Sequence, residues 1–212
     1  MGGYIGLRIQ PDILYGYLYN WFAINSGFLA PAGSHIPNKN ELEELKIQED
    51  ILSDGGAGGR LKEAGYTHWN YPNSDATNAS GFTGIASGIR HYDGSYMLKK
   101  SIQYFASTTD SGADFFYAGK LSYDTSTLIF DAPVFYNVGI SIRLIKDDYN
   151  DPSDIIDYDG NVYHTVYMED TQYWTTTNFR CTHYINGAPI PGPIFSDNEW
   201  FELTTPGYCI NI

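Results

Sequence analysis

Turn-forming residues interrupt this chain at short intervals after its first fifty positions. The 212 residues include 22 Gly and 10 Pro, and Asn and Asp recur between them. Short runs of Tyr, Phe, Val, Ile and Thr, residue types that favour strands, stand between these breaks. Such spacing leaves little room for long strands or helices. It predicts a loop-rich α+β fold of short antiparallel strands with one or two helices.

One stretch carries a helical signal. Asn40 is a suitable N-cap, and Glu43 stands three residues later, as in a capping box. The leucines of this stretch recur at helical spacing, at Leu42, Leu45 and Leu52. We expect a helix at about residues 41–52, stopped by the glycine-rich run 54–59, with one further turn at 60–64.

Strand signals are clearest in three later runs, 139–145, 161–168 and 172–176. Asp-Gly pairs occupy positions 93–94 and 159–160. Such pairs tolerate the positive φ angles of tight two-residue turns, so we expect a β-hairpin at each.

Charge and hydropathy exclude two classes of partner. The chain has 25 acidic and 12 basic residues, a net charge of −13. A nonspecific nucleic-acid binder needs clustered cations, so we expect no nucleic-acid partner. No run approaches the roughly 18 apolar residues of a membrane span, so we expect no membrane insertion. Residues 1–12 also lack the basic and apolar regions of a secretion signal.

Aromatic residues make up 16% of the chain, almost as much as the 17% that is charged. Tyrosine dominates, with 19 copies against 11 Phe and 4 Trp. Tyrosine offers a large amphipathic contact area at small entropic cost, and the Ser, Thr and Asn around it offer adaptable hydrogen bonds. This composition is typical of a contact surface.

Several long motifs follow one another between residues 15 and 147. They are YGYLYNWFAIN (15–25), PAGSHIPNKNELEEL (31–45), the run 57–96, FASTTD (105–110) and GISIRLIKD (139–147). This part of the chain resembles the Fibrobacter succinogenes major paralogous domain. That family is similar to the formylglycine-generating-enzyme-like branch of the C-type lectin fold. The resemblance therefore implies a C-type lectin-like fold.

The last part of the chain, 157–212, also resembles this family. It looks like the segment that normally precedes the YGYLYNWFA motif, although here it follows the rest. We interpret the acidic stretch 148–156 as a linker between 1–147 and this segment, and the chain 1–212 as one circularly permuted domain. Two alternatives stay open: the segment completes a neighbouring subunit, or it begins a truncated second copy.

The family resemblance raises one enzymatic possibility, which the cysteines count against. Formylglycine-generating relatives carry out copper-dependent oxidation with two closely spaced cysteines, whereas here Cys181 and Cys209 lie on a different segment, far apart in sequence. No histidine spacing predicts a metal site, and no G-x-S-x-G nucleophile motif occurs. We therefore expect no catalytic residues and no enzyme. The two cysteines are compatible with one disulfide or two free thiols.

Calcium is the one cofactor that the sequence suggests. The acidic runs 147–151 and 154–159 offer oxygen ligands, although an Asp-Gly hairpin and solvated acids explain them equally well. His35 lies in the helix-entry motif of the family. We expect it to be a hydrogen-bonded structural residue rather than a metal ligand.

Loops and late strands form the ligand-binding face of lectin-like folds, which the resemblance places at residues 92–137. The aromatic candidates for ligand contact are Tyr92, Tyr96, Tyr104, Phe115, Tyr117, Tyr123 and Tyr136. Phe116 is an eighth candidate, but strand alternation buries every second residue and we expect it in the core.

These features favour a noncatalytic binding module of a phage virion or a bacterial surface. It would recognise a host protein or glycan through the Tyr-rich face, which retroelements diversify in some phage proteins of this fold. The family is common in Bacteroidetes-type surface lipoproteins, but the missing signal favours a virion. The alternative is a structural virion or fibre component, a homo-oligomer in which segment 157–212 completes a neighbouring subunit.

Overall fold

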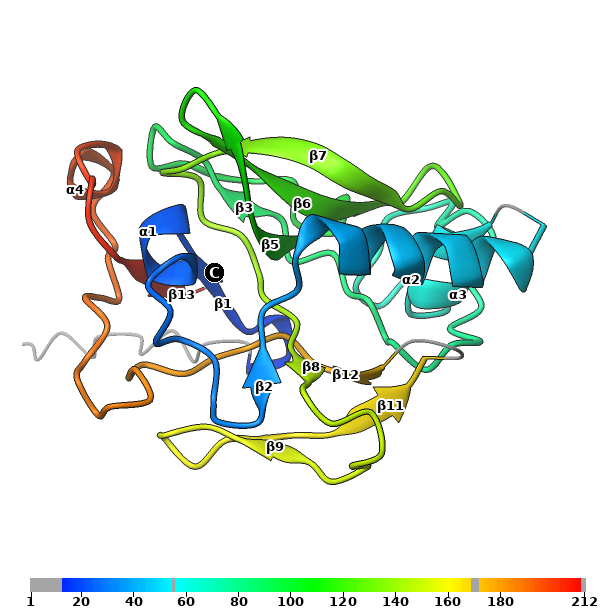
Figure 1. The fold of residues 1–212 in the computed structure, drawn as a ribbon. Coiled ribbons are helices and arrows are strands. Elements are labelled where there is room, and N and C mark those ends of the chain that lie inside the picture. Colours follow the sequence, from blue (N-terminus) through cyan, green and yellow to red (C-terminus); the bar gives the residue numbers. More distant parts are fainter. Residues whose placement is uncertain (1–12, 55, 169–171, 211–212) are drawn as a thin grey trace, which may run out of the picture.

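A computed structural model describes residues 13–54, 56–168 and 172–210 (Figure 1). Residues 1–12, which we expect to lack a secretion signal, therefore lie outside the described residues. Four α-helices, more than the one or two expected, and mostly short antiparallel strands connected by loops make up the described part, although one strand runs over 11 residues. This confirms the loop-rich α+β class, while the C-type lectin-like topology stays a prediction.

Helix α2 is the one long helix among the described residues. The helical elements are a 3₁₀ turn at Ile13–Tyr15, α1 (Trp21–Ile24), α2 (Lys39–Ile51), α3 (Ala57–Leu61) and α4 (Asp197–Phe201). The strands are β1 (Tyr17–Tyr19), β2 (Ser34–His35), β3 (Ile89–Arg90), β4 (Tyr96–Met97), β5 (Ile102–Gly112), β6 (Phe115–Ser122), β7 (Ile129–Phe135), β8 (Ile145–Lys146), β9 (Ile155–Ile156), β10 (Val162–Tyr163), β11 (Thr165–Tyr167), β12 (Tyr173–Thr175) and β13 (Tyr208–Ile210). The one-turn helices α1 and α4 carry no signal that we recognised in the sequence.

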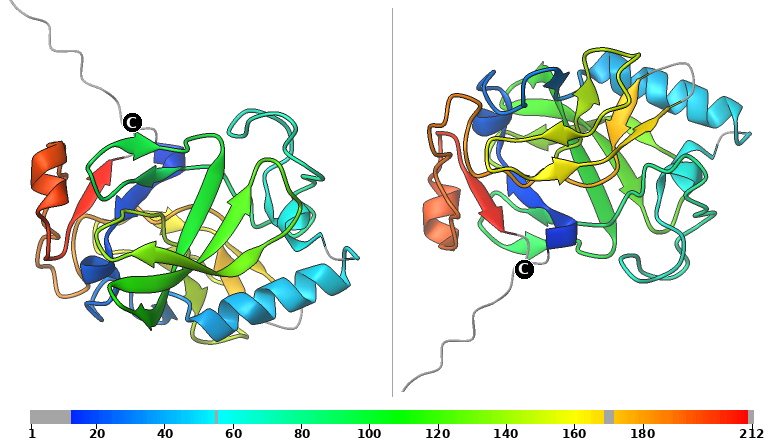
Figure 2. Two further views of the ribbon diagram at one scale, coloured as in Figure 1. Left: turned by 90° about the horizontal axis from the view of Figure 1, so that it is seen from above. Right: turned by 90° about the horizontal axis from the view of Figure 1, so that it is seen from below.

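Two sheets and three strand pairs make up the β-structure. Strands β5, β6 and β7 form an antiparallel sheet, and α2 contacts all three of them. A second sheet has the order β11-β12-β8-β2. The pairs are β1 with β13, β3 with β4 and β9 with β10. Figure 2 shows the red strand β13 beside the blue strand β1 in both views. The last two pairs confirm the hairpins predicted at the Asp-Gly positions.

The N-cap of α2 differs from the one predicted. The Asn38 side chain accepts hydrogen bonds from the backbone N–H groups of Asn40 and Glu41, and Glu41 in turn accepts from the Asn38 N–H. The capping box is therefore Asn38 with Glu41, so the prediction of Asn40 with Glu43 was wrong. At the other end, Leu52 lies just beyond the helix and is 41% exposed.

His35 connects the start of α2 to the end of β8. Its Nε2 lies 2.8 Å from Glu41 Oε1, and its Nδ1 lies 2.6 Å from Asp147 Oδ1. The hydrogen bond to Glu41 and the one to Asp147 raise the pKa of His35, against the opposing effect of burial. The expected structural role of His35 is confirmed.

The run 139–146 crosses the middle of the molecule and is buried along its whole length. We predicted a strand at 139–145, but only β8, at its end, is assigned as one. Ile140 forms a single bridge to Tyr19, and Ser141 forms a single bridge to another strand, β5. The hydrogen-bonding partner changes from residue to residue, so this run joins many elements instead of extending one ladder.

Segment 157–212 pairs with earlier parts of the same chain. Strand β13 lies antiparallel to β1, and β12 pairs with β8 (Figure 1). The segment also contributes to the largest core cluster, through Tyr163, Phe179, Cys181, Ile190 and Tyr208. It thus closes the described fold within one chain, while the circular permutation and exchange between subunits stay predictions.

The acidic stretch predicted as a linker is partly folded. Lys146 is buried, donates to Ser153 Oγ at 2.9 Å and pairs with the Asp151 carboxylate. Ile155 in β9 is buried in the largest core cluster. The stretch 148–156 is therefore anchored in its middle and near its end, while 148–150 are exposed.

Arg143 lies at the centre of the fold with no exposed surface. Its Nη1 donates to the carbonyls of Phe82 and Thr175, both at 2.7 Å. Its Nη2 donates to the Thr83 carbonyl at 2.9 Å, and its Nε donates to Asn178 Oδ1 at 2.7 Å. Burial lowers the pKa of this guanidinium to about 9. Neutral oxygen acceptors therefore stabilise a buried cation.

Asn178 extends the hydrogen-bond network around Arg143, which we call the Arg143 node, to β5 and to the 3₁₀ turn at Ile13–Tyr15. Its Oδ1 also accepts from Gln103 Nε2 at 3.0 Å, and its Nδ2 donates to the Tyr15 carbonyl at 2.9 Å. The Asn178 side chain therefore holds β5, the 3₁₀ turn and the C-terminal segment in place relative to Arg143.

Replacing the buried guanidinium should strongly destabilise the protein. Arg143→Met leaves three buried carbonyls without this donor and removes one of the two donors to Asn178 Oδ1, so we expect a loss of at least about 3 kcal/mol in the free energy of unfolding. Urea denaturation measures this loss. Lys100→Met, which removes an exposed cation, is the control and should change stability by less than about 0.5 kcal/mol. Equal effects of the two substitutions would contradict the stabilising role of the Arg143 hydrogen bonds.

The His35 contacts predict a pH-dependent stability. Its folded pKa is raised above an unfolded value of about 6.5, so its contribution is fully present below that pH and is lost as the pH rises through the folded pKa. Wild type should therefore exceed His35→Gln in unfolding free energy near about pH 6, and this difference should shrink toward about pH 9. His164→Gln, at an exposed histidine, is the matched control. A difference that grows with pH would refute the assignment.

Candidate functional site

The seven aromatic residues predicted to contact a ligand do not form one continuous surface. Tyr92 is exposed, and the other six are half-buried: Tyr96, Tyr104, Phe115, Tyr117, Tyr123 and Tyr136. Phe116 is fully buried, as expected from strand alternation.

Four of these side chains are engaged in contacts within the fold. The ring of Tyr96 is covered by the Arg90 guanidinium, 4.2 Å from its centre. The ammonium of Lys39, at the start of α2, lies 4.3 Å from the centre of the Tyr117 ring. Tyr104 and Tyr123 pack against the two large core clusters. These contacts leave little of the four rings for a ligand.

The other three candidates lie in or beside an open groove of about 330 Å³, which we call the aromatic groove. Three separate parts of the chain line it: α1, the end of the β5–β7 sheet and the loop after α4. Its lining residues are Phe22, Asp114, Phe135, Tyr136, Asn137, Phe201, Leu203 and Thr204.

A stack of aromatic rings fixes Tyr136 in the groove. Its ring stacks on Trp21 at 5.4 Å between centroids, and Trp21 stacks on the buried Phe116 at 4.9 Å. The Tyr136 hydroxyl donates to Asp110 Oδ1 at 2.7 Å, which raises the pKa of Tyr136 to about 12. This part of the groove is therefore rigid and built into the core.

Phenylalanines form the exposed part of the groove. Phe135 is 43% exposed, although it packs against Phe115 with ring centroids 4.0 Å apart and against the edge of Tyr92 at 5.8 Å. Phe201, on α4, is 58% exposed. Two predicted residues, Phe115 and Tyr92, thus support a groove residue without lining the groove.

Asn20 holds the C-terminal wall in place. Its Nδ2 donates to the Thr205 carbonyl at 2.8 Å, and its Oδ1 accepts from the Gly207 N–H at 3.1 Å. Trp200 is fully buried and anchors α4 beneath this loop. Leu203 and Thr204 are thereby positioned opposite the end of β7.

The sequence interpretation missed most of the groove. Phe135 lies inside the predicted face 92–137, and strict alternation along β7 would have exposed it. Phe22 and Phe201 lie outside that face, in one-turn helices with no recognisable signal. Only the tertiary fold brings them to Tyr136.

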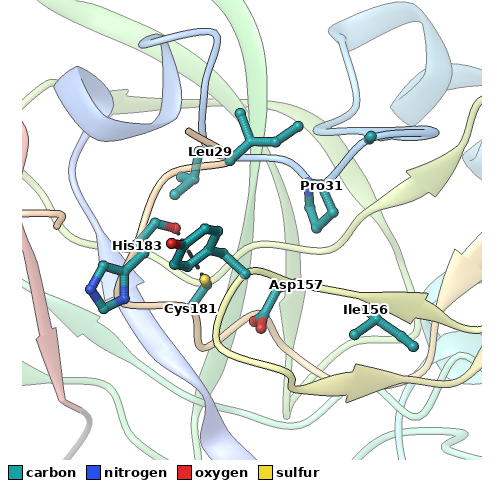
Figure 3. Close-up of a pocket in the computed structure, with 9 residues that line it drawn as sticks. Leu29, Pro31, Ile156, Asp157, Cys181 and His183 are labelled. Atoms are coloured by element: carbon teal, nitrogen blue, oxygen red, sulfur yellow. Dashed lines mark hydrogen bonds between the residues drawn. The ribbon is translucent and has the colours of Figure 1, made fainter. Parts of the chain in front are cut away.

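A smaller cavity of about 220 Å³ lies between the Leu29–Pro31 region and the β9–β10 hairpin (Figure 3). Cys181 borders it and donates to the His183 carbonyl at 3.1 Å, while His183 Nδ1 lies 2.5 Å from Asp159 Oδ1. Burial raises the pKa of the Cys181 thiol to about 12. The thiol is therefore protonated and a poor nucleophile at neutral pH.

The acidic runs considered for calcium bind protein groups instead. Asp147 and Asp159 contact histidines, Asp151 pairs with Lys146, and Asp157 accepts from the Tyr163 hydroxyl at 2.6 Å. Within residues 13–54, 56–168 and 172–210, no three His, Cys, Asp or Glu side chains converge as a metal site requires. The suggested calcium site thus gains no support.

Membrane insertion through a helix finds no support either. In the described part of the chain, every helix is too short or too polar to span a bilayer.

Comparison with known families identifies the chain. The sequence model of the Fibrobacter succinogenes major domain matches residues 10–146, which is more than half of the chain. The protein belongs to this family, as the motifs predicted. Searches of curated proteins and of solved structures returned no significant match.

Both thiols should be unreactive in the native protein. Cys181 and Cys209 are free and buried, and burial raises the pKa of each to about 12. Ellman's reagent should therefore titrate both thiols only after unfolding in guanidinium. Thr127→Cys, at an exposed loop position, is the control and should react at once. Rapid loss of a native thiol would show that one of the two sites is open.

Proposed function

We propose that this protein is a noncatalytic binding module that recognises a surface ligand through the aromatic groove. The observation that carries the proposal is the groove itself, with partly exposed phenylalanines held on a rigid base. Exposed aromatic patches are costly in water, and aromatic side chains dominate the energetics of protein interfaces. A prebuilt groove also lowers the entropic cost of binding.

The proposed setting is the surface of a phage virion or of a bacterium, with a host protein or glycan as the ligand. The protonated, buried thiols support a role without catalysis, because they offer no nucleophile. The competing proposal, a structural fibre component, needs segment 157–212 to join neighbouring subunits. Pairing of β13 with β1 inside one chain favours the binding module.

Substitutions in the groove should weaken recognition without unfolding the protein. Phe135→Ala and Phe201→Ala should each weaken binding to a panel of bacterial cells and immobilised host glycans by about tenfold or more. Phe195→Ala is the matched control, because Phe195 is as exposed as Phe201 but lies outside the groove. Circular dichroism verifies the fold of each variant.

The outcome separates the two proposals. Full binding by both groove variants would refute the groove as the recognition site. No binding by wild type, together with ordered fibres by electron microscopy, would instead support the structural component.

A further inference from the structure

The side chains that line the aromatic groove include one acidic group and no basic group. Asp114 is the one charged side chain among the eight that line it. Glu202 is exposed beside Phe201, and the chain as a whole has a net charge of −13. Such a field favours a cationic ligand at this site.

The Asp114 carboxylate is available for a ligand. Asp110, four residues earlier, already accepts from the Tyr136 hydroxyl and from the Gly112 N–H, both at 2.7 Å. Across the described residues, the carboxylate of Asp114 makes neither a hydrogen bond nor an ion pair. A ligand cation can therefore pair with Asp114 without breaking an internal contact.

The three phenylalanines of the lining favour a polypeptide over a sugar, although Asn137 and Thr204 beside them carry polar groups. Phe22, Phe135 and Phe201 have no polar group with which to bind sugar hydroxyls. The hydroxyl of Tyr136, which could do so, is already bound to Asp110. Aromatic ring faces attract ammonium and guanidinium groups, and they pack well against apolar side chains.

We infer that the aromatic groove binds a segment of a partner protein in which an apolar side chain stands next to an arginine or lysine. The apolar side chain packs between Phe135 and Phe201, and the cation pairs with Asp114. This inference rests on the proposed function, because it specifies the ligand class of the same groove.

Two acetylated dipeptide amides that differ in charge test the inference, Ac-Phe-Arg-NH₂ and its neutral analogue Ac-Phe-citrulline-NH₂. Amide chemical shifts of Phe135, Asn137 and Phe201 in the ¹⁵N-labelled full chain report binding at the groove. The arginine peptide should bind about fivefold more tightly, as a single exposed ion pair allows. Added salt should reduce this preference.

Asp114→Asn should abolish the preference for arginine while preserving the fold. Asp114 has a φ of 67°, a left-handed conformation that asparagine also tolerates. Asp131→Asn, at an exposed position on β7 outside the groove, makes the same charge change and should retain the preference.

Equal affinity for the two peptides, binding of neither, or an unchanged preference in Asp114→Asn would overturn the inference. Shifts of the same amides by methyl α-mannoside or N-acetylglucosamine, with neither peptide bound, would overturn it in favour of a glycan. In all these cases, loss of cell binding by Phe135→Ala would still support the proposed function. Unchanged cell binding by that variant would instead remove the proposed function itself.

Discussion

A buried guanidinium determines how the segments of this protein fit together. Arg143 has no carboxylate partner among the residues that the structure describes, so its charge is tolerated only while neutral oxygens satisfy its donors. Those oxygens come from two regions far apart in sequence, residues 82–83 and 175–178. A fold with few long hydrogen-bond ladders needs such a polar node, because the node admits one arrangement of its loops and penalises others.

The node also explains why an exposed groove can be rigid. Asn137, in the groove, lies two residues before the buried run 139–146 that carries Arg143. Tyr136 is fixed from the other side by its stack on Trp21 and Phe116. The groove residues Tyr136 and Asn137 therefore lie next to a fully buried segment, so the core determines the position of the groove while its rim stays open to solvent.

Local patterns predicted local structure, and tertiary contacts explain the rest. The Asp-Gly hairpins and the position of α2 follow from turn chemistry and leucine spacing. Asn38 and Asn40 both stand three residues before a glutamate, and the tertiary contact of Glu41 with His35 favours the capping box at Asn38. The family motifs predicted the family, but no local pattern joins Phe22 to Phe201, because their proximity depends on segment 157–212.

The contacts of Asn20 determine when during synthesis the groove can be completed. This side chain recognises the backbone of Thr205 and Gly207, which is made after every other part of the groove. A nascent chain that still lacks these residues has Tyr136 and Phe135 but no opposite wall. The proposed affinity for a ligand would consequently arise only once synthesis has passed this loop, and unfinished copies would not compete with complete ones.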